Sequence, residues 1–121
     1  MYQVIAQEGE KIEISLYGEL TADEFQQVIH QLESLCTMHP HIYVLFDAGG
    51  LEKYDFKVFL EEYDFYKEYK SHLKRVALVS DKNVQSFLLD LFNRFTDTEF
   101  RTFDDNQIEE ARKWIFPSRL P

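Results

Sequence analysis

Two short, unbroken apolar runs limit what this chain can fold into. They cover Ile42–Phe46 and Val76–Val79 and contain several β-branched or aromatic side chains. A strand of this kind carries apolar side chains on both faces, so it suits the centre of a sheet that is covered on both sides. Such sheets are mainly parallel, and parallel strands need long crossover connections, usually helices. The two runs therefore predict an α/β fold with a mostly parallel sheet.

The segments around these runs alternate between strand and helix patterns, in the order β-β-α-β-α-β-α-β-α. We expect a single domain, residues 1–121, with five strands in sequential order and four helices. Tyr2–Gln7 and Lys11–Tyr17 alternate around a Gly turn, which predicts an N-terminal antiparallel β-hairpin. The segment Glu99–Phe103 is predicted to form the final strand, at an edge of the sheet. The predicted helices are Ala22–Thr37, which follows a capping box of Thr21 and Glu24, then Tyr54–Tyr69, Asn83–Phe95 and Gln107–Phe116.

The second of these predicted helices, Tyr54–Tyr69, is unusual because seven of its 16 residues are aromatic. At roughly 100° per residue its apolar side chains form two opposite stripes. One stripe can cover the sheet, and the other must meet something else. That neighbour is another helix of the same domain, a second subunit, an apolar or lipid-like ligand, or a membrane surface. The second stripe consists of Tyr54, Val58, Phe65 and Tyr69.

Ligands of open α/β sheets gather outside the carboxyl ends of the strands. Four segments are predicted there: Gly18–Thr21, Asp47–Tyr54, Ser80–Asn83 and Asp104–Asn106. Asp47 is a candidate for binding a ligand hydroxyl or a metal, and its alternative role is to accept backbone N–H groups in a turn. Asp81 and Lys82 open a predicted helix, where they either help to bind an anion or simply cap the helix.

Composition excludes several classes of function. The 13 basic and 22 acidic residues give a net charge of −9, which argues against nucleic-acid binding because that needs a basic face. His39-Pro40-His41 lacks the further ligands of a metal site, and Cys36 lies on the apolar face of a predicted helix. We therefore expect no metal and no cofactor. The chain has one cysteine, no charged-then-apolar leader at its start and no long apolar run. These features predict a cytoplasmic protein.

Several motifs along the chain resemble the SpoIIAA-like family of bacterial proteins, relatives of the STAS and STAS-SEC14-like domains. Gly18-Glu19-Leu20-Thr21-Ala22-Asp23-Glu24-Phe25 is similar to the family's "G-x-L-T-x-x-D/E-F" entry into the first helix. Arg75–Lys82 resembles its "R-x-A-(V/L)-V-(G/S)-D-K" strand and loop. Thr102-Phe103-Asp104 and the segment Glu110–Trp114 resemble its last strand and its "A-x-x-W" closing helix.

The resemblance implies a STAS-type α/β fold, often dimeric, without an established enzymatic activity, and with an apolar cavity near the middle helices. We therefore expect a non-enzymatic binding module whose second and third helices face an apolar or lipid-like ligand, which allows peripheral contact with a membrane. The alternative is a homodimeric interaction module. STAS regulators carry a phosphorylatable Ser or Thr at the entry to the middle helix, but the matching Asp55-Phe56-Lys57-Val58 has no hydroxyl. A phosphorylation switch at that position is therefore not expected.

Overall fold

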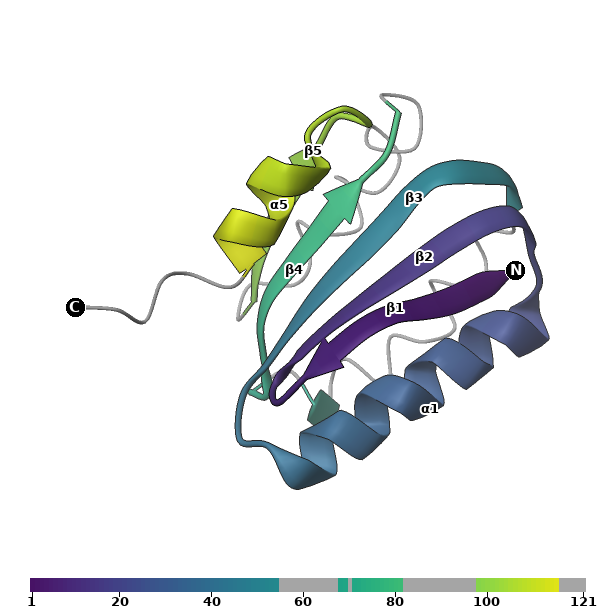
Figure 1. Ribbon diagram of the computed structural model, residues 1–121. Coiled ribbons are helices and arrows are strands. Elements are labelled where there is room, and N and C mark those ends of the chain that lie inside the picture. The colour runs from purple at the N-terminus through teal and green to yellow at the C-terminus, as the bar shows by residue number, and fades with distance from the viewer. Residues whose placement is uncertain (55–67, 70, 82–97, 116–121) are drawn as a thin grey trace.

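The protein forms one five-stranded mixed sheet with helices on both faces (Figure 1). The computed structural model describes residues 1–54, 68–69, 71–81 and 98–115. The strand order is β1-β2-β3-β4-β5, as the sequence predicts, with β1 and β2 antiparallel and the three later pairings parallel. The strands are β1 Tyr2–Glu8, β2 Lys11–Leu20, β3 Ile42–Tyr54, β4 Leu73–Val79 and β5 Glu99–Phe103.

Two helices lie within the described residues, α1 at Ala22–Met38 and α5 at Ile108–Ile115. Both were predicted to within one residue at each end. The other two predicted helices, Tyr54–Tyr69 and Asn83–Phe95, fall almost wholly outside the described residues. Within the first of them, Glu68 and Tyr69 are helical. The predicted α/β class is therefore confirmed, with a mixed sheet.

The N-terminal hairpin turns at Gly9 and Glu10, between the paired residues Glu8 and Lys11. Gly9 has a φ of +56°, which a residue with a side chain rarely adopts. Glycine at the first central position is the signature of a two-residue type II′ turn, whose twist matches that of the flanking strands. The glycine of this turn therefore fixes the register of β1 on β2.

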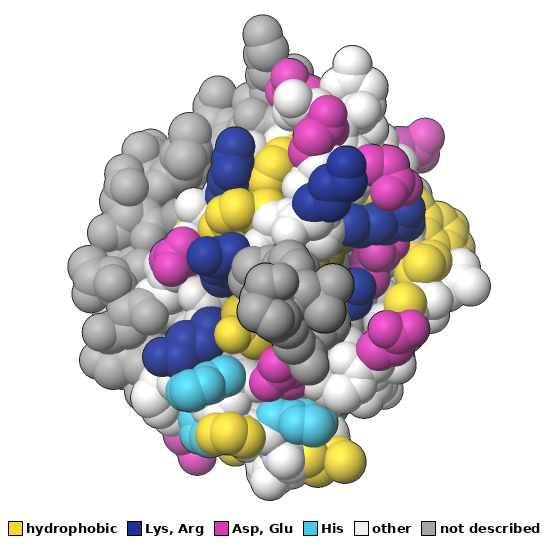
Figure 2. Space-filling model, turned by 60° about the vertical axis from the view of Figure 1, so that its left-hand side comes forward, with side chains coloured by type: hydrophobic (Ala, Val, Ile, Leu, Met, Phe, Trp, Pro, Cys, Tyr) yellow, Lys and Arg dark blue, Asp and Glu magenta, His cyan; other side chains and the backbone are white. Residues whose placement is uncertain are grey.

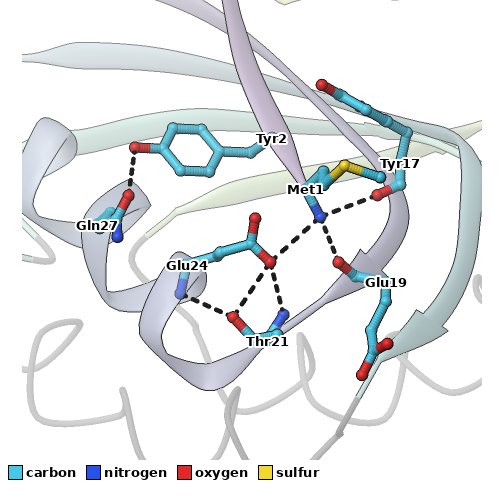
Figure 3. Close-up of polar contacts among 7 residues, drawn as sticks. All are labelled: Met1, Tyr2, Tyr17, Glu19, Thr21, Glu24 and Gln27. Atoms are coloured by element: carbon cyan, nitrogen blue, oxygen red, sulfur yellow. Dashed lines mark hydrogen bonds and ion pairs between the residues drawn. The ribbon is translucent and has the colours of Figure 1, made fainter.

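The first turn of α1 combines the predicted capping box with the N-terminal ammonium group (Figure 3). The Glu24 N–H donates to Thr21 Oγ1 at 3.2 Å, and the Thr21 N–H donates to Glu24 Oε1 at 3.1 Å. The Met1 ammonium donates to the carbonyls of Tyr17 and Glu19 and lies 3.3 Å from Glu24 Oε1. One carboxylate therefore links the start of β1, the end of β2 and the start of α1.

These contacts predict a pH-dependent stability. The backbone hydrogen bond from Thr21, more than any other contact, lowers the pKa of Glu24 below its ordinary value of 4.5. The folded state therefore holds this group charged more readily than the unfolded state does. Its stabilising effect is complete above the unfolded pKa and is lost as pH falls through the lower folded pKa. Glu24→Gln should thus melt at a lower temperature than wild type near pH 7, and the gap should close at the acid end of a calorimetric series. A gap that stays constant with pH would contradict this assignment.

The sheet has a separate apolar core on each face. Successive strand residues point to opposite faces, and adjacent Val44 and Leu45 accordingly join different clusters. Val44 packs in the larger core with Ile12, Ile14 and the buried side of α1. Leu45 packs in the smaller core under α5, which contains Ala77, Val79, Phe103, Ala111 and Ile115. Burial on both faces explains the unbroken apolar runs in the first half of β3 and the second half of β4.

Strand β3 is longer than the sequence predicts. The prediction ended it at Phe46 and placed Asp47 in a loop and Tyr54 in a helix, but the strand continues through both to Tyr54. The extension is held by parallel pairing with the second half of β2, from Tyr17↔Gly50 to Leu20↔Tyr54, with register shifts on either side of Gly18. Backbone pairing therefore extends a strand over polar and glycine residues that carry no apolar signal.

Helix α5 is fastened to the sheet by a buried ion pair. Arg112 Nε and Nη2 donate to the two carboxylate oxygens of Glu13 on β2 at 2.9 and 2.8 Å, although Glu13 is only 5% exposed. The hydrogen bonds to Glu13, more than any other contact, raise the pKa of Arg112 above its ordinary range. Arg75 reinforces the helix end by donating to the Trp114 carbonyl at 2.8 Å, with its guanidinium over the indole ring. Acidic and basic side chains are intermixed over the face shown in Figure 2.

Candidate functional site

An open hollow of about 440 Å³ lies at the carboxyl ends of β4 and β5. Two of the four segments that the sequence places at this edge line it together. Ser80 and Asp81 follow β4, and Asp104, Asp105 and Asn106 follow β5. The hollow is the place where the sheet topology and the sequence both predict a ligand.

The backbone holds the two sides of this hollow together. The Ser80 N–H donates to the Phe103 carbonyl at 3.0 Å, which continues the β4–β5 ladder beyond Val79. Ser80 is fully buried, and its hydroxyl donates to the Asp81 carbonyl at 3.2 Å. The Asp104 N–H donates to Gln107 Oε1 and the Gln107 N–H donates to the Asp104 carbonyl, both at 2.9 Å. These bonds form the tight turn that leads into α5.

Asp47 serves the local backbone. It lies within β3, between Ser15 of β2 and Val79 of β4, and its Oδ1 accepts the Gly49 N–H at 3.2 Å. This is the turn-type bond that the sequence left open as the alternative to ligand binding. A Cβ built on Gly49 would lie 3.4 Å from Asp47 Oδ1 and 3.6 Å from Asp105 Oδ1. The β3 backbone therefore passes close to one wall of the hollow.

The sequence matches the family model described as SpoIIAA-like over residues 11–116. This match covers most of the chain. The protein belongs to the SpoIIAA-like family. Comparison with the curated proteins gave no match.

A solved structure supports the same fold. The chain is similar to an uncharacterized protein of the DUF3478 family from Shewanella loihica PV-4, which has a SpoIIAA-like fold, with a TM-score of 0.70. The two sequences are 22% identical, and the match covers 96% of this chain and 93% of that one. At this identity the likeness establishes the fold alone. The family resemblance drawn from the motifs is thus confirmed.

Tyr69 is the one member of the second aromatic stripe whose side chain is described in this SpoIIAA-like domain. It is partly buried and packs against the core that α1 covers. Its ring meets His72 edge to face with centroids 6.1 Å apart, and desolvation raises the pKa of its hydroxyl. This end of the stripe therefore packs inside the domain. Val58, Phe65 and Lys82 lie outside the described residues, and Tyr54 is described only as the last residue of β3.

Cys36 is held as a small apolar side chain in the α1 core of the SpoIIAA-like domain. It is 3% exposed, and burial raises the pKa of its thiol to about 11. Because the thiolate is the reactive form, Cys36 should resist a disulfide reagent at pH 8 in the native protein and react fully in 6 M guanidinium chloride. Rapid labelling of the native protein would show that α1 opens more readily than its packing implies.

None of the described helices is long and apolar enough to cross a membrane. No group of three or more His, Cys, Asp or Glu side chains in residues 1–54, 68–69, 71–81 and 98–115 is arranged to hold a metal ion.

The sequence did not indicate the Glu13–Arg112 ion pair. Glu13 alternates with apolar residues, a pattern that predicts a solvent-facing position on a strand.

Proposed function

We propose that this SpoIIAA-like domain is a non-enzymatic binding module whose ligand docks in the hollow beyond β4 and β5. The hollow itself carries the proposal: its volume of about 440 Å³ falls in the range of small-molecule sites, roughly 300–1,000 Å³. Its rim offers carboxylate and amide groups but no described cation. The ligand that suits it presents hydroxyl or amine hydrogen-bond donors.

The sequence supports an apolar body for the same ligand. The aromatic segment Tyr54–Tyr69 and the apolar segment Asn83–Phe95 follow β3 and β4, whose carboxyl ends lie at this edge of the sheet. A lipid-like molecule would place its apolar part against these segments and its polar head in the hollow. Such a molecule would also bring the domain to a membrane surface.

The states of the described reactive groups support a binding role over catalysis. Asp47 accepts a backbone N–H, and burial with a raised pKa keeps the Cys36 thiol protonated. Catalysis would instead need a nucleophile and a base positioned to face a substrate. We therefore assign the hollow to recognition.

Native mass spectrometry of freshly purified protein, without delipidation, tests the proposal. We expect a non-covalent adduct whose mass identifies the ligand, and we expect Asp81→Asn with Asp104→Asn to remove it. Glu110→Gln with Glu109→Gln changes charge equally on exposed α5 positions and serves as the control. An adduct that survives the Asp81 and Asp104 changes places the ligand elsewhere. A clean dimer without adduct favours the homodimeric alternative and overturns the proposal.

A further inference from the structure

The outer edge of β1 is an open strand edge. Among the described residues, β1 pairs with β2 on one side and with no strand on the other (Figure 1). A strand in this position presents a row of backbone N–H and C=O groups to any chain that can pair with it. This edge lies on the opposite side of the sheet from β5 and is separate from the hollow.

The hydrogen-bond pattern shows which backbone groups face outward. Met1 and Tyr17 exchange two bonds, both at 3.0 Å, so they form a hydrogen-bonded pair. Such pairs alternate with non-bonded ones along an antiparallel ladder, so the backbone groups of Tyr2 and Val4 point away from β2. At the other end of β1, Glu8 and Lys11 flank the two-residue turn, which makes them a hydrogen-bonded pair. The next pair is then non-bonded, so the backbone groups of Gln7 also point away from β2.

The two edges of the sheet differ in how they are protected. Natural sheets usually guard an edge with charged side chains or very short strands. Strand β5 has five residues, and two of them, Glu99 and Arg101, are charged. Strand β1 has no charged residue from Tyr2 to Gln7, and within the part of the chain that the structure describes its protection is a bulge between Val4 and Ala6. The β1 edge is therefore the one suited to strand addition.

Apolar side chains beside this edge offer anchors for an added strand. Ile5 is 47% exposed and Tyr17 is 37% exposed. Leu16, the strand neighbour of Tyr17, packs in the α1 core, so Tyr17 points to the opposite face, and Ile5 lies at the bulge between Val4 and Ala6. Figure 3 shows the Tyr17 ring directed away from α1. Helix α5 packs mainly on β3, β4 and β5, at the other side of the sheet.

Charge decides between two occupants of this edge. Residues 1–54, which include β1 and its neighbours, contain nine acidic and two basic residues. A second copy of the chain would bring two such acidic regions together, whereas a cationic partner would be attracted. We propose that the outer edge of β1 binds an extended peptide segment rich in Lys or Arg and apolar residues, which adds to the sheet as a sixth strand.

The test uses a fluorescein-labelled alternating Lys-Val octapeptide and fluorescence anisotropy. Gln7→Pro removes an outward N–H without breaking a β1–β2 bond, and Gln7→Ala keeps that N–H as the matched control. We expect Gln7→Pro to weaken binding by about tenfold or more, with Gln7→Ala near wild type. A Glu-Val octapeptide should not bind. An octapeptide N-methylated at alternate residues should also fail, and this arm does not depend on how any variant folds.

Three results would overturn the proposal. Equal binding of the methylated and unmethylated peptides would show electrostatic adhesion without strand pairing. No binding of the Lys-Val peptide at low salt would leave the edge without the proposed partner. A concentration-dependent dimer that Gln7→Pro abolishes would show that a second copy occupies the edge instead.

Discussion

Phe103→Ala is expected to lower the free energy of unfolding by about 3–5 kcal/mol, the usual cost of removing a buried phenylalanine ring. Phe103 is 4% exposed, ends β5 and fills the smaller core beneath α5. The ring centroids of Phe103 and Trp114 are 6.1 Å apart, and the central carbon of the Arg101 guanidinium lies 4.9 Å from the centroid of the Phe103 ring. Urea unfolding followed by circular dichroism would measure the change.

The bond from the Ser80 N–H to the Phe103 carbonyl is a backbone bond and is kept in the variant, so the loss of stability reports the ring itself. Phe103→Leu keeps most of the apolar volume and should cost clearly less, so it serves as the control. A loss below about 1 kcal/mol for Phe103→Ala would mean that the core under α5 contributes little to stability, contrary to the packing described above.

Arg112→Leu is expected to destabilise the protein by about 3 kcal/mol, because it leaves the buried Glu13 carboxylate without its partner. The estimate sits at the low end of the usual range, since the Arg112 side chain is 38% exposed and water can reach part of the site. Chemical unfolding at pH 7 gives the value. Glu109 is the second partner of Arg112, and its side chain is 72% exposed. Glu109→Gln removes only this exposed partner and should change stability by less than about 0.5 kcal/mol.

A double variant separates the contribution of the Glu13–Arg112 ion pair from that of the other contacts of these two side chains. Glu13→Leu with Arg112→Leu replaces both charges by apolar groups and should recover much of the stability lost in Arg112→Leu. If the double variant is less stable than Arg112→Leu, then Glu13 has stabilising partners other than Arg112.

The sequence predicted those parts of the fold that rest on local patterns. The capping box of Thr21 and Glu24 fixed the start of α1, and the alternation around Gly9 predicted the hairpin. The apolar runs beginning at Ile42 and Val76 predicted the paired central strands. Each of these signals spans only a few neighbouring residues, which is why the sequence alone was sufficient.

Two features that depend on distant pairing were predicted wrongly or not at all. The extension of β3 to Tyr54 comes from backbone pairing with β2 over Asp47, Gly49 and Gly50, which look like turn residues in isolation. Glu13 and Arg112 are 99 positions apart, and only the docking of α5 buries the carboxylate. For the site, the sequence identified Asp81 and the segment Asp104–Asn106, while the structure gives Asp47 a backbone partner.

The length of β3 creates a gradient of local stability along one strand. Its first half, Ile42–Asp47, lies between β2 and β4, whereas among the described residues Ala48–Tyr54 pairs with β2 alone. Opening the second half therefore breaks the hydrogen bonds of only one ladder, together with the contacts of Ala48 and Leu51 in the core under α1. Because Gly49 sits against Asp105, such a partial opening would widen one wall of the hollow. The candidate site thus borders a part of the sheet that is held by one ladder where the first half of β3 is held by two.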